Sequence, residues 1–185
     1  MLIRKEAKLK KIVPTIVLIL VFFLIYFLQV NFFNYVTIAG VKPNLFVVFI
    51  LFIGLFTTGK YAMVAGIICG IYLDLMYSQN IGITAIMFCI VGFLGGYFDK
   101  NFSKENRITI MLMVVGCTII FEVGCYFLNI IISQFNIEIA IFSRKLAIEV
   151  LYNTLLVIVL YPLIQKGGYS IELKFKRNNI LTRYF

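Results

Sequence analysis

The stretch that decides the fold is GKYAMVAGIICGIYLDLMYSQNIGITAIMFCIVGFLGGYF, residues 59–98. It holds seven of the chain's 13 glycines, and from position 61 onward it contains a single charged residue, Asp74. Glycine is costly in a helix exposed to water, but within a membrane it lets two helix backbones come close together. The composition of this stretch therefore predicts apolar membrane helices that pack backbone against backbone.

Small residues recur at a helical spacing within the stretch. Ala62, Gly66 and Gly70 lie four residues apart, and Asp74 continues this first series at the same spacing. Gly92 and Gly96 form a second series. A spacing of four places each series on one face of a helix, so the first series forms a narrow groove that ends in a carboxylate. A lone carboxylate in that position is either a structural tie between helices or a functional site.

The composition of the whole chain is that of an integral membrane protein. Of its 185 residues, 62% are hydrophobic and only 14% are charged, which leaves no long hydrophilic segment for a soluble catalytic module. The absence of histidine removes the commonest metal ligand and argues against zinc or Ser-His-Asp chemistry. Four cysteines lie inside apolar runs without metal-ligand spacing and are interpreted as packing residues: Cys69, Cys89, Cys117 and Cys125. We expect no catalytic residue, cofactor or metal.

Six transmembrane helices are predicted, at about residues 12–33, 44–58, 61–77, 81–98, 108–132 and 146–164. At 1.5 Å per residue, a helix of about 20 residues spans a hydrocarbon core of about 30 Å, whereas the second helix reaches only about 22 Å. Pro43 begins this second helix. The segment 134–145 is expected to be a loop along the membrane interface, and basic tails are expected at 1–11 and 165–185. The fold class is therefore an all-α integral membrane protein with a single domain, 1–185.

The distribution of basic residues predicts the orientation. Fourteen of the 17 lysines and arginines fall on the side of the two termini, and three fall on the other side. Basic residues accumulate on the cytoplasmic side of membrane proteins, so both termini are expected in the cytoplasm of a multi-pass protein of the cell membrane. The net charge of +9 is then explained by topology and by anionic lipid, and nucleic acid is not expected as a partner.

Three acids lie inside predicted helices, Asp74, Glu122 and Glu149. Such groups are costly in a membrane and are candidates for function. Counted from the cytoplasmic ends, Asp74 and Glu122 lie at a depth of about 21 Å, Glu149 at about 24 Å and Asn153 at about 18 Å. The three acids are therefore expected at a similar level in the outer half of the membrane, with Asn153 close to Glu122.

Two of these acids have a structural interpretation beside a functional one. Glu149 follows Lys145 by four residues, which is the spacing of a helical ion pair. Glu122 is placed to hydrogen-bond Asn153 or a hydroxyl group between helices. The alternative for Glu122 is a role in binding a ligand or a partner.

Asp74 also has two structural interpretations. It is placed either to tie the third helix to a backbone amide at the start of the fourth, or to face Lys42. A path for ions is not favoured, because no lysine or arginine lies at the membrane centre and no second polar layer continues toward the cytoplasm.

The middle of the chain resembles a known family. The shared pattern consists of Lys-Pro-Asn-Leu at 42–45, GIICGIYLD at 66–74, NIGITA at 80–85 and GFLGGYF at 92–98. With these motifs, about a third of the chain is similar to the bacterial rod shape-determining protein MreD family, and the length, six spans and basic termini agree. We interpret the following as positions of helix packing or partner binding: Pro43, Ala62, Gly66, Gly70, Asp74, Gly82, Gly92 and Gly96.

The resemblance implies a non-enzymatic membrane scaffold of the cell-elongation machinery. Such a subunit would bind an MreC-like membrane protein, beside an MreB-type filament and the peptidoglycan synthases, and support rod shape. The family is also distantly similar in fold to the substrate-binding subunits of energy-coupling-factor vitamin transporters, which gives the alternative function. Those subunits dock through small residues in the first helix, whereas residues 16–29 here contain no Gly, Ala or Ser.

Overall fold

The computed structural model describes residues 2–78, 80–104, 106–133 and 138–176. This part of the chain is helical and contains no β-strand, so the prediction of an all-helical fold is confirmed. The elements are α1 (Leu2–Phe27), η1 (Leu28–Phe32), α2 (Leu45–Phe56), α3 (Gly59–Tyr77), α4 (Ile83–Asn101), α5 (Arg107–Ser133) and α6 (Ile139–Lys176). The short element η1 is a π-helical continuation of α1.

Five of the described helices are long and apolar enough to cross a membrane. These spans are Val13–Phe32, Gly59–Tyr77, Ile83–Asn101, Arg107–Ile132 and Ile139–Leu173. The sixth apolar helix, α2, is shorter, at 12 residues. Helices of this length and composition indicate a membrane protein.

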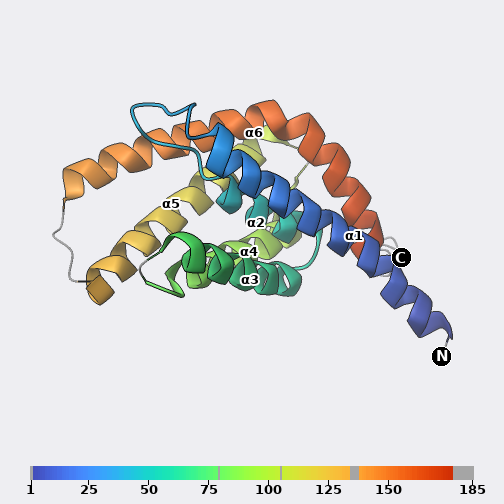
Figure 1. The fold of residues 1–185 in the computed structure, drawn as a ribbon. Coiled ribbons are helices and arrows are strands. Elements are labelled where there is room, and N and C mark those ends of the chain that lie inside the picture. The colour runs from blue at the N-terminus through green and yellow to red at the C-terminus, as the bar shows by residue number, and fades with distance from the viewer. Residues whose placement is uncertain (1, 79, 105, 134–137, 177–185) are drawn as a thin grey trace.

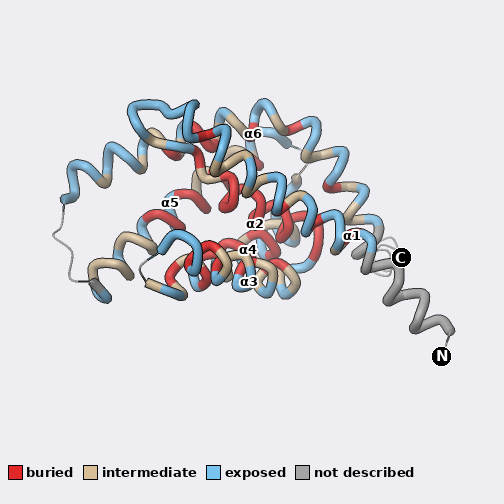
Figure 2. Tube along the Cα trace, in the orientation of Figure 1, coloured by how far each residue is buried: buried red, intermediate tan, exposed pale blue. Residues whose placement is uncertain are grey.

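The short helix α2 lies at the centre of the fold. All 12 of its residues are buried, and it packs against each of the five other α-helices (Figure 2). A helix that is apolar on every side belongs in the interior of a protein, and α2 has the sequence LFVVFILFIGLF. At about 18 Å it is shorter than the hydrocarbon core, so its ends cannot both reach the membrane surfaces.

Helices α3 and α4 cross with their backbones in contact (Figure 1). A Cβ atom added at Gly66 would lie 2.6 Å from the carbonyl oxygen of Phe88, and one added at Gly70 would overlap the Cα of Ala85. These neighbours are backbone atoms, which cannot rotate away as the end of a side chain can. The small-residue series of α3 is therefore occupied by α4 itself.

Helix α4 presents glycine to α2 as well. A Cβ at Gly54 of α2 would lie 2.7 Å from the Cα of Gly95, and one at Gly92 of α4 would lie 2.7 Å from the backbone of Ala62 in α3. Gly96 lies against Gly59 at the opposite end of α3 from Asp74. Helix α4 thus holds α2 on one face and α3 on another.

The first predicted span, residues 12–33, agrees with the apolar span Val13–Phe32, but the helices at both ends of the chain are longer than predicted. Helix α1 already begins at Leu2, where a basic tail over 1–11 was expected, and α6 runs Ile139–Lys176 instead of 146–164. The physical reason is that hydrophobicity marks the membrane part of a helix, whereas Lys, Arg and Glu continue a helix readily in water. Most of the expected loop 134–145 and the first part of the expected tail 165–185 are therefore helical.

Residues 134–137 and 177–185, on which parts of the expected loop and tail fall, lie outside the described residues. The remaining predicted boundaries agree with the observed helices to within three residues. Helix α6 contains Pro162 and is bent in its second half (Figure 1), as expected where proline removes a backbone hydrogen bond.

At one end of the bundle, Lys104 in the loop between α4 and α5 makes several polar contacts. Its Nζ lies 2.8 Å from Asp99, 2.5 Å from Glu172 of α6 and 3.2 Å from the carbonyl oxygen of Leu55 in α2. Burial lowers the pKa of Lys104, but the two carboxylates outweigh it and hold the pKa above its usual value. Helix α1 begins and α6 ends at this same end of the molecule (Figure 1).

We expect Gly70→Leu to destabilise the protein strongly, because a side chain at this position must displace the backbone of Ala85. Overpacking of a tight contact costs about 1–3 kcal/mol or more. Thermal unfolding in a non-ionic detergent measures the effect. Gly116→Ala is the matched control, because a Cβ atom there meets nothing within 4 Å. Equal unfolding temperatures for Gly70→Leu and the wild type would contradict the backbone contact.

Candidate functional site

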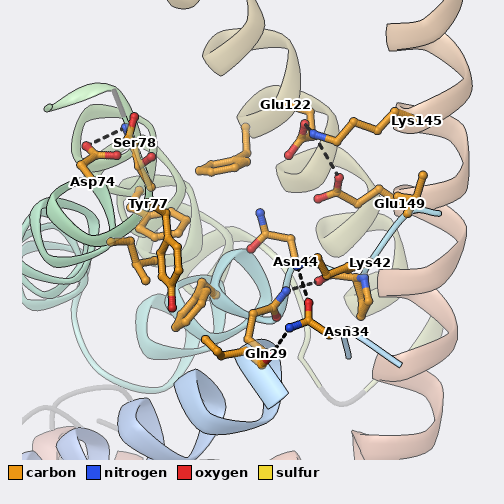
Figure 3. A pocket seen from close by; sticks show the side chains of 18 of the residues that line it. Gln29, Asn34, Lys42, Asn44, Asp74, Tyr77, Ser78, Glu122, Lys145 and Glu149 are labelled. Carbon is orange, nitrogen blue, oxygen red and sulfur yellow. Dashed lines mark hydrogen bonds and ion pairs between the residues drawn. The ribbon is translucent and has the colours of Figure 1, made fainter. Parts of the chain in front are cut away.

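A polar cavity of about 620 Å³ lies at the end of the bundle away from Lys104. Its walls come from η1, the loop before α2, the end of α3, the start of α4, the middle of α5 and the first half of α6. The polar and aromatic residues that line it in Figure 3 include Gln29, Asn34, Lys42, Asn44, Asp74, Tyr77, Ser78, Glu122, Lys145 and Glu149. The cavity therefore gathers side chains from nearly every part of the chain.

The floor of the cavity is the start of α2. The first backbone N–H groups of a helix have no partner within the helix and need one elsewhere. Here the Asn44 side chain accepts from the N–H of Val47 at 3.3 Å, and Gln29 accepts from the N–H of Leu45 at 3.2 Å. The N–H of Asn44 donates to Oδ1 of Asn153 at 2.8 Å. Polar side chains of η1 and α6 thus hold the start of α2.

Pro43 contributes to the same arrangement. Its carbonyl oxygen accepts a hydrogen bond of 2.7 Å from Nε2 of Gln29, and Pro43 itself is buried in the cavity wall. Gln29 therefore binds the chain on both sides of Asn44, through one donor and one acceptor. It lies in a π-helical turn, and such turns are often found at functional sites.

Asp74 ties α3 to the start of α4. Its Oδ2 accepts from the backbone N–H groups of Gly82 at 2.8 Å, Thr84 at 3.2 Å and Ala85 at 3.4 Å. A negative charge at this place also interacts favourably with the helix dipole. Gly82 has φ +105°, a conformation that favours glycine. The first of the two arrangements expected for Asp74 is therefore present, while Lys42 forms a hydrogen bond within its own loop.

The other two acids meet at one lysine. Lys145 Nζ lies 2.9 Å from Oε2 of Glu122 and 3.8 Å from Oε2 of Glu149, so the expected pair four residues apart on α6 is present. The expected hydrogen bond from Glu122 to Asn153 is wrong. Asn153 faces the start of α2 and donates to Thr118 at 3.1 Å, while Glu122 lies one turn further along α5 and faces Lys145.

Two carboxylate oxygens of residues that line the cavity are buried and have no hydrogen-bond partner in the described part of the chain. They are Oδ1 of Asp74 and Oε1 of Glu149, and these two residues are only 1% and 3% exposed. A buried acceptor left without a partner costs about 1–3 kcal/mol, and more when it is charged. The cavity also carries three carboxylates against the two ammonium groups of Lys42 and Lys145.

A second cavity, of about 580 Å³, lies between α5 and the first part of α6, where these two helices diverge (Figure 1). It shares Glu122 and Lys145 with the first cavity. This ion pair therefore forms part of the wall of both cavities.

The residues that the sequence singled out fall into two groups. The structure brings Asp74, Glu122 and Glu149 to one cavity, with Asn153 buried beside it. The small residues lie instead in the α3–α4 contact: Ala62, Gly66, Gly70, Gly92 and Gly96. Sequence reasoning missed Gln29, although a glutamine near the end of a long apolar run was a visible signal.

The fold and the open cavity lined by charged and apolar side chains define an all-helical membrane protein whose helices meet through glycine. A family model described as rod shape-determining protein MreD matches residues 10–167. The chain belongs to this family, which indicates a role in rod shape determination. No curated protein and no solved structure matches the chain in the corresponding searches.

We expect Asp74→Ala to lower stability by about 0.5–2 kcal/mol, the usual cost of losing a helix cap. Asp74→Asn keeps an acceptor oxygen for the N–H groups of α4 and should lose less. Thermal unfolding of the detergent-solubilised variants measures the difference. An equal loss in the two variants would contradict the capping role.

Proposed function

We propose that this chain is a non-enzymatic scaffold subunit of the bacterial cell-elongation machinery that supports rod shape and lateral peptidoglycan synthesis. The observation that carries the proposal is the match of the family model across residues 10–167. The structure supports it through a dense helical body with little material outside the membrane helices. Such a body is suited to holding other membrane proteins in place.

We further propose that the chain is a single domain in the cell membrane, with six passes and both termini in the cytoplasm. The 14 basic residues on one side and three on the other support this orientation. The contacts of Lys104 support it too, because they join the end of α2, the α4–α5 loop and α6 at the end where α1 begins. Helix α2 makes a short pass, completed by the loop that leads into it.

The proposed partner is an MreC-like membrane protein, with an MreB-type filament and peptidoglycan synthases nearby. The groove at Ala62, Gly66 and Gly70 is filled by α4, so the partner has to contact another surface. In our proposal the small residues keep α3 and α4 in a fixed arrangement, and the partner binds to exposed apolar faces such as that of α1. Leu20 and Phe23 of α1 are more than half exposed.

The alternative is a substrate-binding subunit of an energy-coupling-factor-type vitamin transporter. The cavity beside Asp74, Glu122 and Glu149 is the observation that favours it, because its size is within the range of small-molecule sites. The bulky apolar sequence of 16–29 counts against docking of a transporter partner through small residues of α1. An ATPase-containing module in place of an MreC-like protein would support the alternative.

In a rod-shaped bacterium that depends on this protein, depletion should produce wide or round cells, and re-expression should restore the rods. Cell width measured by microscopy tests this outcome. In the same cells, affinity purification of the tagged protein from detergent extracts should recover an MreC-like protein. Normal rods after complete depletion would refute the proposed function.

The orientation is tested with reporter fusions. Green fluorescent protein at residue 185 should fluoresce, whereas alkaline phosphatase inserted after Gly40 should be active, because the Gly40 loop is expected outside the cell. Gly40 is exposed, with nothing within 4 Å of its Cβ position, so the loop has room for an insertion. Phosphatase activity at residue 185 would contradict the orientation.

A further inference from the structure

The polar cavity offers more hydrogen-bond acceptors than the chain satisfies. Asp74 uses Oδ2 to hold α4, and its Oδ1 has no partner in the described part of the chain. Glu149 directs Oε2 toward Lys145, and its Oε1 likewise has none. Figure 3 shows the two carboxylates on different walls of the cavity, one from α3 and one from α6.

We propose that this cavity binds an organic cation that carries N–H groups, such as a primary ammonium or a guanidinium. Its N–H groups would donate to Oε1 of Glu149, and Asp74 on the other wall would add a second negative charge to the cavity. The inference goes beyond the scaffold function and does not depend on it.

The charges around the cavity favour a cation over an anion. Three carboxylates line the cavity, and two lysines oppose them. Lys145 is already bound by Glu122 at 2.9 Å, and Lys42 by a loop asparagine at 2.7 Å. A cationic donor would therefore meet carboxylate oxygens without a partner, whereas an anion would meet ammonium groups that each already bind an oxygen.

The size and the remaining walls favour an organic group over a single ion. A water molecule takes a share of about 30 Å³ in the liquid, so about 620 Å³ exceeds the space that one hydrated group needs. Apolar side chains line part of the cavity: Phe46, Leu73, Phe88 and Phe121. They offer a surface for an alkyl chain, and aromatic faces attract cations as well.

The same chemistry has two sources in a membrane. One is a soluble amine, and the other is the headgroup of phosphatidylethanolamine, which carries a primary ammonium. Phosphatidylcholine is the matched lipid control, because its ammonium has the same charge and no N–H group.

The test uses the full-length protein in a non-ionic detergent, with butylammonium as the probe and butyltrimethylammonium as the matched control. Butylammonium should raise the unfolding temperature of the wild type in a saturable way, and butyltrimethylammonium should not. Glu149→Gln should weaken butylammonium binding roughly 10- to 100-fold, the range of a hydrogen bond to a charged group. Glu138→Gln, an exposed acid that lines only the second cavity, should leave it unchanged.

Nanodiscs distinguish the two sources. If the headgroup is the ligand, the wild type should unfold at a higher temperature in phosphatidylethanolamine than in phosphatidylcholine, and Glu149→Gln should remove the difference. If a soluble amine is the ligand, butylammonium should act equally in both lipids.

The proposal is overturned if neither butylammonium nor phosphatidylethanolamine stabilises the wild type, which would leave water as the occupant. It is also overturned if the trimethylated probe binds equally well, or if Glu149→Gln binds like the wild type. Asp74→Asn, compared at its own unfolding temperature, provides a second variant on the opposite wall. Its binding should weaken less than that of Glu149→Gln, because Asp74→Asn removes a negative charge from the cavity but no contact with the ammonium.

Discussion

The start of α2 is the constraint on which the rest of the structure depends. Backbone groups that lie within an apolar layer must be satisfied by the protein, since no water is there to do so. The N–H groups of Asn44, Leu45 and Val47 are satisfied by side chains, two of which come from η1 and α6. A 12-residue helix cannot reach both membrane surfaces, so the start of α2 lies deeper in the bundle than the ends of the helices around it. Its backbone N–H groups therefore need hydrogen-bond partners from the protein. The same shortness leaves the space above α2 that becomes the cavity.

The glycine contacts of α4 complement this arrangement. Helix α2 offers only Gly54 to α4, whereas α3 meets α4 along its whole length through small residues. Within a membrane, such contacts gain from dispersion and close approach, because lipid tails remove the hydrophobic driving force between helices. Asp74 then fixes how far α3 and α4 slide along each other, since its carboxylate must reach the first amides of α4. The glycine contacts and the hydrogen bonds of Asp74 thus together fix the position of α3 relative to α4.

Much of this architecture could be predicted from the sequence, and the failures have physical causes. Apolar runs located the helices, and the spacing from Ala62 to Asp74 predicted both the stripe and the tie. Spacing along the chain predicts the depth of Glu122 but not the direction in which its side chain points, so Asn153, one of the partners expected for Glu122, is wrong. Asn153 lies at a similar depth but turns toward the start of α2. Hydropathy predicts the part of a helix that lies in the membrane and not the full length of the helix, so the predicted α6 is too short. The role of Gln29 could not be predicted, because its side chain binds the start of α2 and the place of that start beside η1 is known only from the structure.

The contact between α3 and α4 has a mechanical consequence. Where backbones touch, no side chain lies between them that could change rotamer and absorb a displacement. The helix pair α3–α4 is therefore stiff along its length, from Gly59 at one end to Asp74 at the other. A displacement of this pair at the Gly59 end therefore also moves Asp74 and the cavity wall to which it belongs.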